Sequence, residues 1–179
     1  MHLKTIYFGG GCFWCTEAIF KELHGVMEVV PGYMGGTTYQ PSYEAVCSGT
    51  TGHAEVVKIY YNDNEISTAD LLDIFFATHD PTTPNRQGND VGSQYRSIIF
   101  YSDDTQREEA RKAIDRVQST LNANVVTEVV SATEFFPAEE YHYNYYQNNM
   151  SAPYCTIVIS PKLEKLRKKF NDKLEDMYK

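Results

Sequence analysis

Three consecutive glycines at positions 9–11 separate an apolar, strand-like segment at residues 3–8 from a stretch with helical spacing. Glycine lets the backbone turn tightly, so this pattern predicts a strand–turn–helix unit at the start of the fold. The apolar stripe of the predicted helix consists of Cys15, Ala18, Ile19 and Leu23. Gly25 is its predicted stop, and Cys12 lies at or next to its N-terminus.

Beyond this unit, predicted strands alternate with predicted helices. Strands are expected at residues 29–36 (with a turn), 54–61, 96–101, 125–130 and 156–159. One helix is expected to begin at the capping-box pair Ser67 and Asp70 and to end near His79. Further helices are expected at residues 104–121, 137–148 and 161–178, and one helical turn is expected within residues 39–51. Residues 80–94 form a long loop, and such loops are more often functional than filler. We expect one α+β domain over residues 1–179, with helices packed on a small mixed sheet.

The composition fits a globular domain and excludes two classes of partner. The 179 residues are 42% hydrophobic and carry a net charge of −8. Phosphate-rich partners need a basic surface, so neither nucleic acid nor a membrane is expected. Residues 162–179 contain seven Lys or Arg against four Asp or Glu, which we interpret as a solvated helix face. No apolar run approaches the ~18 residues that span a bilayer, and no secretory signal is expected. No segment of the sequence looks like an apolar stripe that needs a second chain to cover it, so a monomer is expected.

The four cysteines, at positions 12, 15, 47 and 155, are too sparse for a disulfide scaffold. They favour functional thiols in a reducing compartment, so we expect a cytoplasmic protein. Cys12 and Cys15 form a C-x-x-C, which is typical of a thioredoxin-like dithiol or of half a zinc site. A metal is not expected, because there is no second C-x-x-C and the five histidines lack ligand spacing. The histidines taken as polar or packing residues are His53, His79 and His142, with His53 as the exception to consider because it stands near Glu55.

Cys12 is the strongest candidate for a reactive group. The dipole at a helix N-terminus favours the thiolate, which is the nucleophilic form of cysteine. Glu55 stands at the start of a predicted strand. Close to a thiolate and aromatic rings, its carboxyl group would be desolvated and would become a proton donor. The pattern alone favours a solvated Glu55 instead. Residues 88–97, which begin inside the long loop, suit either binding or a turn-rich connection.

Five stretches of the chain occur in an order that is specific for one enzyme family. They are GGCFW (10–14), GYMGG (32–36), YEAVCSGTTGHAEVV (43–57), QGNDVGSQYRS (87–97) and FFPAEEYHYNYYQNN (135–149). In this order they resemble the A-type peptide methionine sulfoxide reductases. The resemblance covers most of the chain up to about Cys155.

The resemblance implies a reaction and a set of site residues. Cys12 attacks the sulfur of the S epimer of methionine sulfoxide, in proteins or free, and becomes a sulfenic acid. A disulfide follows, which thioredoxin or another thiol reductant recycles. The implied pocket consists of a methyl wall of Phe13 and Trp14, oxygen contacts from Tyr43, Glu55 and Tyr95, and support from Asp90. The implied fold is a two-layer α+β sandwich with a ferredoxin-like core, without a metal or organic cofactor.

The resolving thiol does not follow from the resemblance. Many relatives have Gly at position 15 and carry recycling cysteines in a Gly-rich C-terminal tail, whereas this chain ends in a charged helix. Cys155, in a flexible-looking stretch, is the first candidate. Cys15 is the second, although it also fits the apolar stripe of its helix, and Cys47 is interpreted as structural. Direct reduction of the sulfenic acid by a small thiol is a third route.

Two other functions remain open at this stage. A thioredoxin-like dithiol oxidoreductase would use Cys12 and Cys15 and would need neither Glu55 nor the long loop. A non-enzymatic binder of oxidised or Met-rich segments would use a cleft lined by some of the 14 tyrosines. Neither alternative explains the full set of ordered motifs.

Overall fold

The computed structural model describes residues 2–179, so Met1 lies outside the described residues. The strands are β1 (Leu3–Gly9), β2 (Val26–Met34), β3 (Ala54–Asn62), β4 (Arg86–Gln87), β5 (Asp90–Val91), β6 (Ile98–Tyr101), β7 (Glu128–Ser131) and β8 (Phe136–Pro137). The helices are α1 (Phe13–Phe20), α2 (Tyr43–Cys47), α3 (Thr68–Ala77), α4 (Asp104–Gln118), α5 (Tyr145–Asn148) and α6 (Ser160–Lys169). No helix between residues 2 and 179 is long and apolar enough to cross a membrane.

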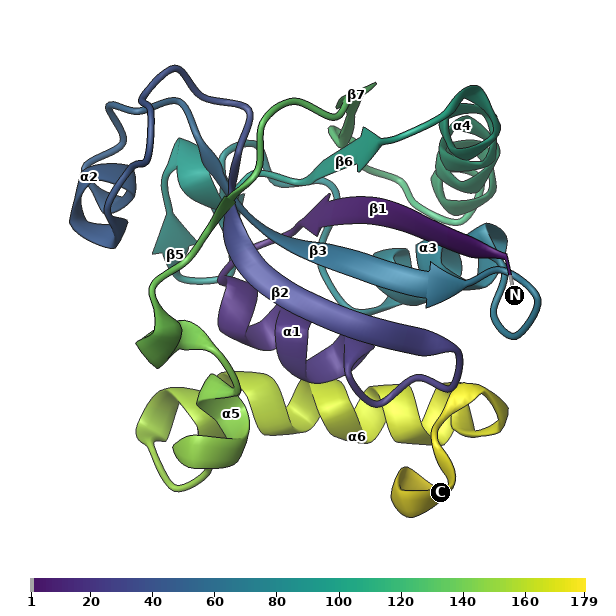
Figure 1. The fold of residues 1–179 in the computed structure, drawn as a ribbon. Coiled ribbons are helices and arrows are strands. Elements are labelled where there is room, and N and C mark those ends of the chain that lie inside the picture. The colour runs from purple at the N-terminus through teal and green to yellow at the C-terminus, as the bar shows by residue number, and fades with distance from the viewer. Residues whose placement is uncertain (1) are drawn as a thin grey trace.

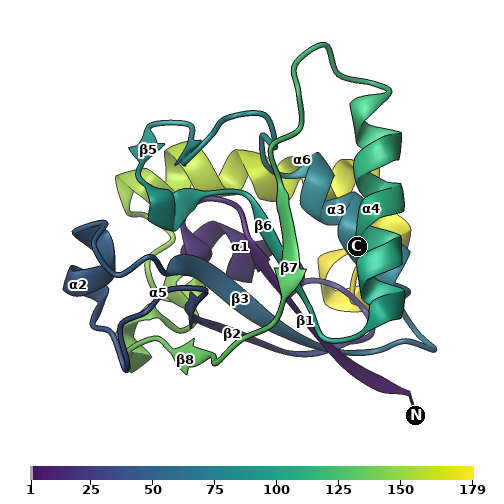
Figure 2. The ribbon, with the colours of Figure 1, turned by 90° about the horizontal axis from the view of Figure 1, so that it is seen from above.

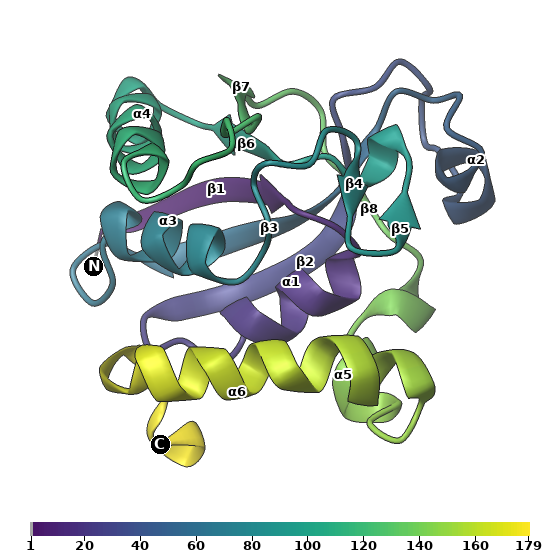
Figure 3. The same ribbon diagram turned by 180° about the vertical axis from the view of Figure 1, so that it is seen from behind.

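One mixed sheet forms the centre of the molecule, with the strand order β7–β6–β1–β3–β2–β8. Strands β6 and β7 run parallel, and the other neighbours run antiparallel. Helices α1, α3 and α6 lie on one side of this sheet, with α1 between the sheet and α6 (Figures 1 and 2). Figure 3 looks onto that helical side. The expected α+β arrangement with a mixed sheet is confirmed.

The alternation of side chains along β3 decides where its first residues point. Successive side chains of a strand face opposite sides of the sheet. Val57 and Ile59 belong to the main core under the helices. Ala54 and Val56 belong to a smaller cluster with residues of β2 and β6. Glu55 lies two residues before Val57 and four before Ile59, so its side chain faces the same side of the sheet as theirs. Its carboxyl group therefore points into the main core.

Helix α3 begins as the sequence predicts. The Ser67 hydroxyl accepts a hydrogen bond from the Asp70 N–H at 3.0 Å, and the Asp70 carboxylate accepts one from the Ser67 N–H at 3.4 Å. This capping box satisfies two backbone donors that a helix N-terminus leaves unpaired. The buried side chains of α3, including Leu71, Leu72 and Phe75, then pack into the main core.

The strand predicted at residues 156–159 is wrong. Residues Cys155–Ile159 form a π-helical turn that continues into α6. Cys155 and Ile159 are buried four residues apart, while Ile157 is 72% exposed. A helical period therefore buries this β-branched run more completely than a strand period could.

The closing helix was predicted over residues 161–178 but ends at Lys169. The chain then turns back, and the Leu174 backbone pairs with Leu23 in an isolated β-bridge. The Glu175 N–H also donates to the Glu22 carbonyl at 2.8 Å. These backbone contacts to the segment after α1 outweigh helix propensity. Met177, near the end of the predicted helix, is 80% exposed.

The helix predicted at residues 137–148 is also wrong for most of its length. Pro137 pairs with Gly32 at the edge of the sheet, and the Ala138 N–H donates to the Pro31 carbonyl at 2.9 Å. Asn144 adopts a left-handed conformation with φ 55°, which interrupts any continuous helix. Only the 3-10 turn Glu140–His142 and the short helix α5 remain helical.

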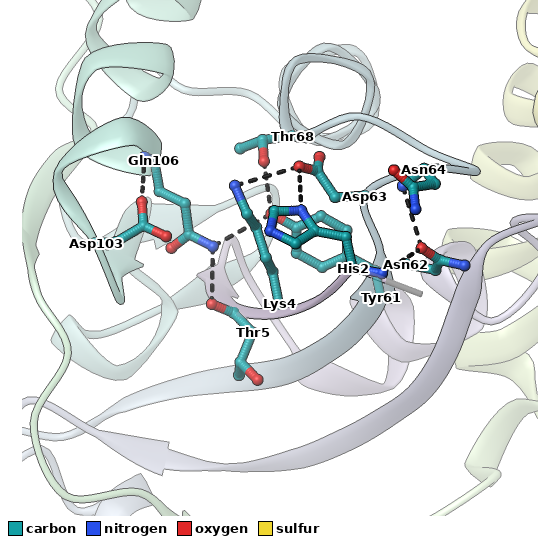
Figure 4. A network of polar contacts seen from close by, with 10 residues as sticks. All are labelled: His2, Lys4, Thr5, Tyr61, Asn62, Asp63, Asn64, Thr68, Asp103 and Gln106. Carbon is teal, nitrogen blue, oxygen red and sulfur yellow. Dashed lines mark hydrogen bonds and ion pairs between the residues drawn. The ribbon is translucent and has the colours of Figure 1, made fainter.

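A buried polar network joins helix α4 to the sheet at the end of β1 remote from Cys12 (Figure 4). Gln106 is fully buried. Its side-chain amide donates to the Thr5 carbonyl at 2.9 Å and to the Tyr61 hydroxyl at 3.2 Å. The Tyr61 hydroxyl also bonds Thr68 at 2.5 Å. These bonds satisfy polar groups that would otherwise be stranded in the core.

We therefore expect Gln106→Leu to lower the free energy of unfolding by about 2–4 kcal/mol, because it leaves several buried partners unpaired. Urea denaturation measures this change. The exposed Glu108→Gln on the same helix is the control and should change stability by less than about 0.5 kcal/mol. Equal stability of the two variants would show that the network does not support the fold.

Candidate active site

The glycine turn delivers Cys12 to the N-terminus of α1, as the sequence predicts. Cys12 is the N-cap residue, and its carbonyl accepts the Cys15 N–H at 3.1 Å. Gly11 has φ 95°, and a Cβ at this position would lie 2.7 Å from the Gln87 side chain. The Gly11 N–H donates to the Tyr95 carbonyl at 3.2 Å. Glycine is therefore required here for both backbone conformation and space, and the turn is tied to the long loop.

The Cys12 thiol is buried, with 6% of the residue exposed. Burial raises its pKa well above the usual range, and the nearby Glu55 adds to this effect. A hydrogen bond from the Trp14 N–H at the helix N-terminus acts in the opposite direction but does not prevail. The helix N-terminus therefore favours the thiolate, as expected, but its effect is smaller than that of burial. In the substrate-free protein desolvation dominates and Cys12 keeps its proton.

Glu55 is 1% exposed, so the solvated position that the pattern alone favoured is wrong. Its Oε1 accepts a hydrogen bond from the Phe13 N–H at 3.1 Å. Its Oε2 is buried and has no partner within residues 2–179. Burial raises the pKa of Glu55 to about 8, although the Phe13 N–H lowers it. The carboxyl group is therefore protonated at neutral pH and can donate a proton next to Cys12.

Two tyrosines lie in the same region. Tyr43 is the first residue of α2, and Tyr95 ends a 3-10 turn in the long loop. Both are half-buried. Burial raises the pKa of each hydroxyl, and Glu55 adds to the shift. Both hydroxyls therefore remain protonated and can act as hydrogen-bond donors.

Phe13 and Trp14 present aromatic surface beside Cys12. Phe13 is fully buried, and its ring lies parallel to the Tyr43 ring at 6.4 Å. Trp14 is half-buried. The Trp14 ring stacks on Tyr145 with a centroid distance of 3.7 Å and an angle of 7°. Only part of the Trp14 surface is therefore available to a ligand.

Asp90 is connected to the thiol region through Tyr154. The Tyr154 hydroxyl donates to the Asp90 carboxylate at 2.9 Å. The same hydroxyl lies 3.5 Å from the Cys15 sulfur. Sequence reasoning gave Tyr154 no role, although it stands next to Cys155. Its contact with the loop depends on tertiary structure, which the local pattern does not contain.

The four cysteines are all free thiols. Cys15 lies on the first turn of α1 and is buried. Cys155 is fully buried in the helical turn before α6. Cys47 lies exposed at the end of α2, which gives no support to a packing role for its side chain.

The three histidines differ in their surroundings. His53 bridges the Gly36 N–H and the Thr38 carbonyl, and His79 bonds the Phe75 carbonyl and Ser97. Both are structural links, as expected. His142 instead lies against Phe13, Trp14 and Tyr43, so treating it as an ordinary packing residue missed its place in the site. Nowhere in residues 2–179 do three or more His, Cys, Asp or Glu side chains gather as metal ligands would.

A free thiol at a helix N-terminus, beside a protonated carboxyl group and tyrosine hydroxyls, has the chemistry of a cysteine-dependent oxidoreductase. The family model described as "Peptide methionine sulfoxide reductase" matches residues 4–174. A protein of that name from Chromobacterium violaceum is 55% identical over 176 residues, which are 97% of this chain and 100% of the relative.

Solved structures agree with this match. Mxr1 from Saccharomyces cerevisiae in reduced form has a TM-score of 0.82 and 36% identity, covering 86% of this chain and 90% of that one. Mxr1 in complex with Trx2 has a TM-score of 0.58 and 25% identity, covering 80% and 85%. The chain belongs to the peptide methionine sulfoxide reductase family. It is an oxidoreductase that reduces methionine sulfoxide at the expense of thiols.

The burial of Glu55 predicts a pH-dependent stability. Its folded pKa of about 8 exceeds the ordinary 4.5, so the proton is bound more tightly in the folded state. The stabilising effect is present below about pH 4.5 and is lost as pH rises towards about 8. Gln cannot ionise, so Glu55→Gln should gain stability over the parent by about 1.4 kcal/mol per pH unit in this window.

Urea denaturation at a series of pH values measures the difference. Glu65→Gln, an exposed change in the turn after β3, is the matched control and should follow the parent at every pH. If Glu55→Gln also follows the parent, the carboxyl group is ionised in the folded protein and cannot be the proton donor.

Proposed function

We propose that this protein reduces the S epimer of methionine sulfoxide, in proteins and as the free amino acid, with Cys12 as nucleophile and Glu55 as acid. The observation that carries this proposal is a buried thiol next to a carboxyl group that keeps its proton. The unpartnered Oε2 of Glu55 offers a donor to an oxygen-bearing substrate. A sulfoxide supplies such an oxygen next to an electrophilic sulfur.

The proposed reaction balances without an added oxidant. Glu55 transfers its proton to the sulfoxide oxygen, which makes the sulfur more electrophilic. The Cys12 sulfur attacks the substrate sulfur and forms a sulfur–sulfur bond, and the thiol proton passes to the Glu55 carboxylate. Glu55 returns this proton to the oxygen, which leaves as water when the substrate sulfur–oxygen bond breaks. Water then attacks the Cys12 sulfur, the sulfur–sulfur bond breaks with its electron pair going to methionine, and Cys12 becomes a sulfenic acid.

The same geometry supports the binding roles implied for the pocket. Phe13 and Trp14 form the wall for the methyl group, because they are the apolar rings next to Cys12. Tyr43 and Tyr95 bind the sulfoxide oxygen together with Glu55, since their protonated hydroxyls can stabilise charge that develops there. A further residue, Asp90, supports the site through its hydrogen bond with Tyr154.

The sulfenic acid then condenses with a second thiol, which forms a disulfide and releases water. Sequence reasoning placed Cys155 first and Cys15 second. We now propose Cys15, because it lies three residues from Cys12 on the same helical turn, as in a C-x-x-C dithiol. The alternative, Cys155, is fully buried in a helical segment and would have to leave its packing to reach Cys12.

An external dithiol completes the cycle by exchange with the protein disulfide. The structure of the yeast protein in complex with Trx2 supports thioredoxin as this partner. Free thiols at all four cysteines support a reducing, cytoplasmic location. We also retain a monomer as the proposed state, because no segment of the sequence forms an unmatched hydrophobic seam.

The finer description of the fold belongs to the same proposal. The four central strands have the order β6–β1–β3–β2, with α1 between β1 and β2 and α3 between β3 and β6. This arrangement supports a two-layer sandwich with a ferredoxin-like core. The family match over residues 4–174 supports a single domain spanning residues 1–179.

Turnover of the separated epimers of N-acetyl methionine sulfoxide amide tests the reaction. With dithiothreitol as reductant, only the S epimer should be reduced. Cys12→Ser should abolish turnover, and Glu55→Gln should lower kcat/KM by about 10²–10⁴-fold. Glu65→Gln is the control and should keep parental activity. Turnover by Cys12→Ser would overturn the scheme, while reduction of insulin disulfides without sulfoxide turnover would favour a dithiol oxidoreductase.

Mass spectrometry after one turnover without reductant identifies the resolving thiol. Cys12 and Cys15 share the tryptic peptide 5–21, so a bond between them gives a single peptide that resists alkylation. A bond from Cys12 to Cys155 instead links two peptides. We expect the first product, and Cys15→Ser should accumulate a sulfenic acid that dimedone traps. A bond from Cys12 to Cys47 would contradict both assignments.

A further inference from the structure

The helical side of the molecule carries a groove that the reaction scheme does not use (Figure 3). It lies between the C-terminal ends of α3 and α4 and one side of α6, and residues 80–82 of the long loop also line it. Its volume is about 1170 Å³. Pockets that enclose a small molecule have volumes of roughly 300–1,000 Å³. The size of the groove therefore suits a segment of a larger partner.

Three lysines line the wall that α6 contributes to the groove. Lys162, Lys165 and Lys169 are spaced three and four residues apart, so they share one side of the helix. None of them forms an ion pair with another side chain of residues 2–179. They extend over about 10 Å of the helix axis, which corresponds to about three residues of an extended chain. Part of the basic stretch that the sequence places on a solvated helix face therefore also lines this groove.

The acidic residues of the groove already have partners within the protein. Asp73 pairs with Arg116 at 3.0 Å. The Asp80 carboxylate accepts hydrogen bonds from the Thr82 N–H at 2.9 Å and from the Thr82 hydroxyl at 2.6 Å. The charges of the three lysines therefore remain uncompensated, although the chain as a whole carries a net charge of −8. The groove is a local positive surface on an acidic protein.

Apolar side chains accompany the lysines in the groove. Phe76 and Pro81 are buried, and Val117 and Phe170 are half-buried. Leu121 is 37% exposed. A small inorganic anion would leave this apolar surface in water, whereas a peptide with both acidic and apolar side chains would cover it. Nucleic acid is a poorer match, because the overall negative charge of the protein repels a long polyanion.

The groove lies close to the two thiols of α1. Gln87 lines the groove, and the same side chain lies 2.7 Å from where a Cβ on Gly11 would stand. Gly11 immediately precedes Cys12. Burial raises the pKa of Cys15, and the charge of Lys162 is the largest effect that opposes this rise. Both observations place the groove next to the segment that carries Cys12 and Cys15.

We propose that this groove is a docking site for an acidic, partly apolar segment of the protein substrate. Docking of that segment holds an oxidised methionine of the same substrate near Cys12 and raises its local concentration. The groove thus lowers KM for substrates that carry such a segment and leaves kcat unchanged. This inference rests on the proposed function and names the class of protein substrate that the enzyme prefers.

Fluorescence anisotropy of a labelled peptide tests the docking step by itself. The probe is a methionine-free peptide of Glu, Leu and Ala, and its control has Gln in place of every Glu. The Glu peptide should bind at least about tenfold more tightly than the Gln peptide, and its affinity should fall as the salt concentration rises. Equal binding of the two peptides would show that the groove does not recognise acidic groups. Tighter binding of a single-stranded oligonucleotide would assign the groove to nucleic acid, and either result overturns the proposal.

Removal of the lysine charges tests where the peptide binds. The groove variant combines Lys162→Gln, Lys165→Gln and Lys169→Gln. It should bind the Glu peptide at least about tenfold more weakly than the parent, because three ion pairs with the peptide are lost.

The matched control variant removes three exposed positive charges that do not line the groove. It combines Arg111→Gln, Lys112→Gln and Lys168→Gln, so its net charge equals that of the groove variant. Its affinity for the Glu peptide should stay within about twofold of the parent. An equal loss in both variants would mean that general attraction binds the peptide, which contradicts a docking site in the groove.

Steady-state kinetics connects docking to turnover. Each substrate peptide carries one S-methionine sulfoxide, joined through a flexible Gly-Ser linker to the Glu peptide or to the Gln peptide, on its N-terminal or its C-terminal side. In the parent, the KM of the Glu-linked substrate should be at least about tenfold lower than that of the Gln-linked substrate for one of the two orientations, with equal kcat. The groove variant should lose this difference and the control variant should keep it.

The outcomes separate this proposal from the proposed function. If the parent does not reduce N-acetyl methionine sulfoxide amide, the proposed function fails. If the parent reduces that compound but does not bind the Glu peptide, only the docking site fails. Binding of the Glu peptide without a lower KM in either orientation would also overturn the docking site, and the reductase activity would stand.

Discussion

The hydrogen bond from the Phe13 N–H to the Glu55 carboxyl group is the contact on which the site depends. It joins the first turn of α1 to the start of β3 inside the main core. Glu55 reaches that core because its side chain has the same facing as Val57 and Ile59. One backbone donor does not offset the loss of water, so the carboxyl group keeps its proton. The placement of an acid next to Cys12 thus follows from the alternation of side chains along β3.

The parts of this arrangement that the sequence predicted are local ones. The three glycines before Cys12 permit a tight turn, and the helical spacing of the residues after them places Cys12 at the start of a helix. The capping box at Ser67 and Asp70 is similar, because both partners lie within one helical turn. Such signals do not depend on the rest of the fold. The family motifs added the candidate residues, and the structure brings Cys12, Glu55, Tyr43 and Tyr95 into one region.

The parts that the sequence did not predict depend on contacts between distant segments. The pattern around Glu55 favoured a solvated carboxylate, since the pattern does not show which face the helices cover. The run at residues 156–159 has β-branched residues, yet no sheet edge receives it, and packing against α1 makes it helical. His142 lies within the matched stretch at residues 135–149, but that stretch does not show what the side chain contacts, and Tyr154 lies outside all five stretches. Their places in the site arise from hydrogen bonds to Trp14 and Asp90, which are 128 and 64 residues away in the chain.

The protonation states of Glu55 and Cys12 depend on each other. An ionised Glu55 would raise the pKa of Cys12 further, so a protonated Glu55 leaves the thiol easier to deprotonate. In the proposed mechanism Glu55 gives its proton to the sulfoxide, and the carboxylate that remains can then take the thiol proton. The pair can therefore supply an acid and a nucleophile in turn without exchange with solvent, which a buried site would impede. An exposed thiolate would gain nucleophilicity in the free protein but would be open to oxidation between turnovers. In this mechanism, burial would link the activation of Cys12 to the arrival of a substrate that accepts the first proton.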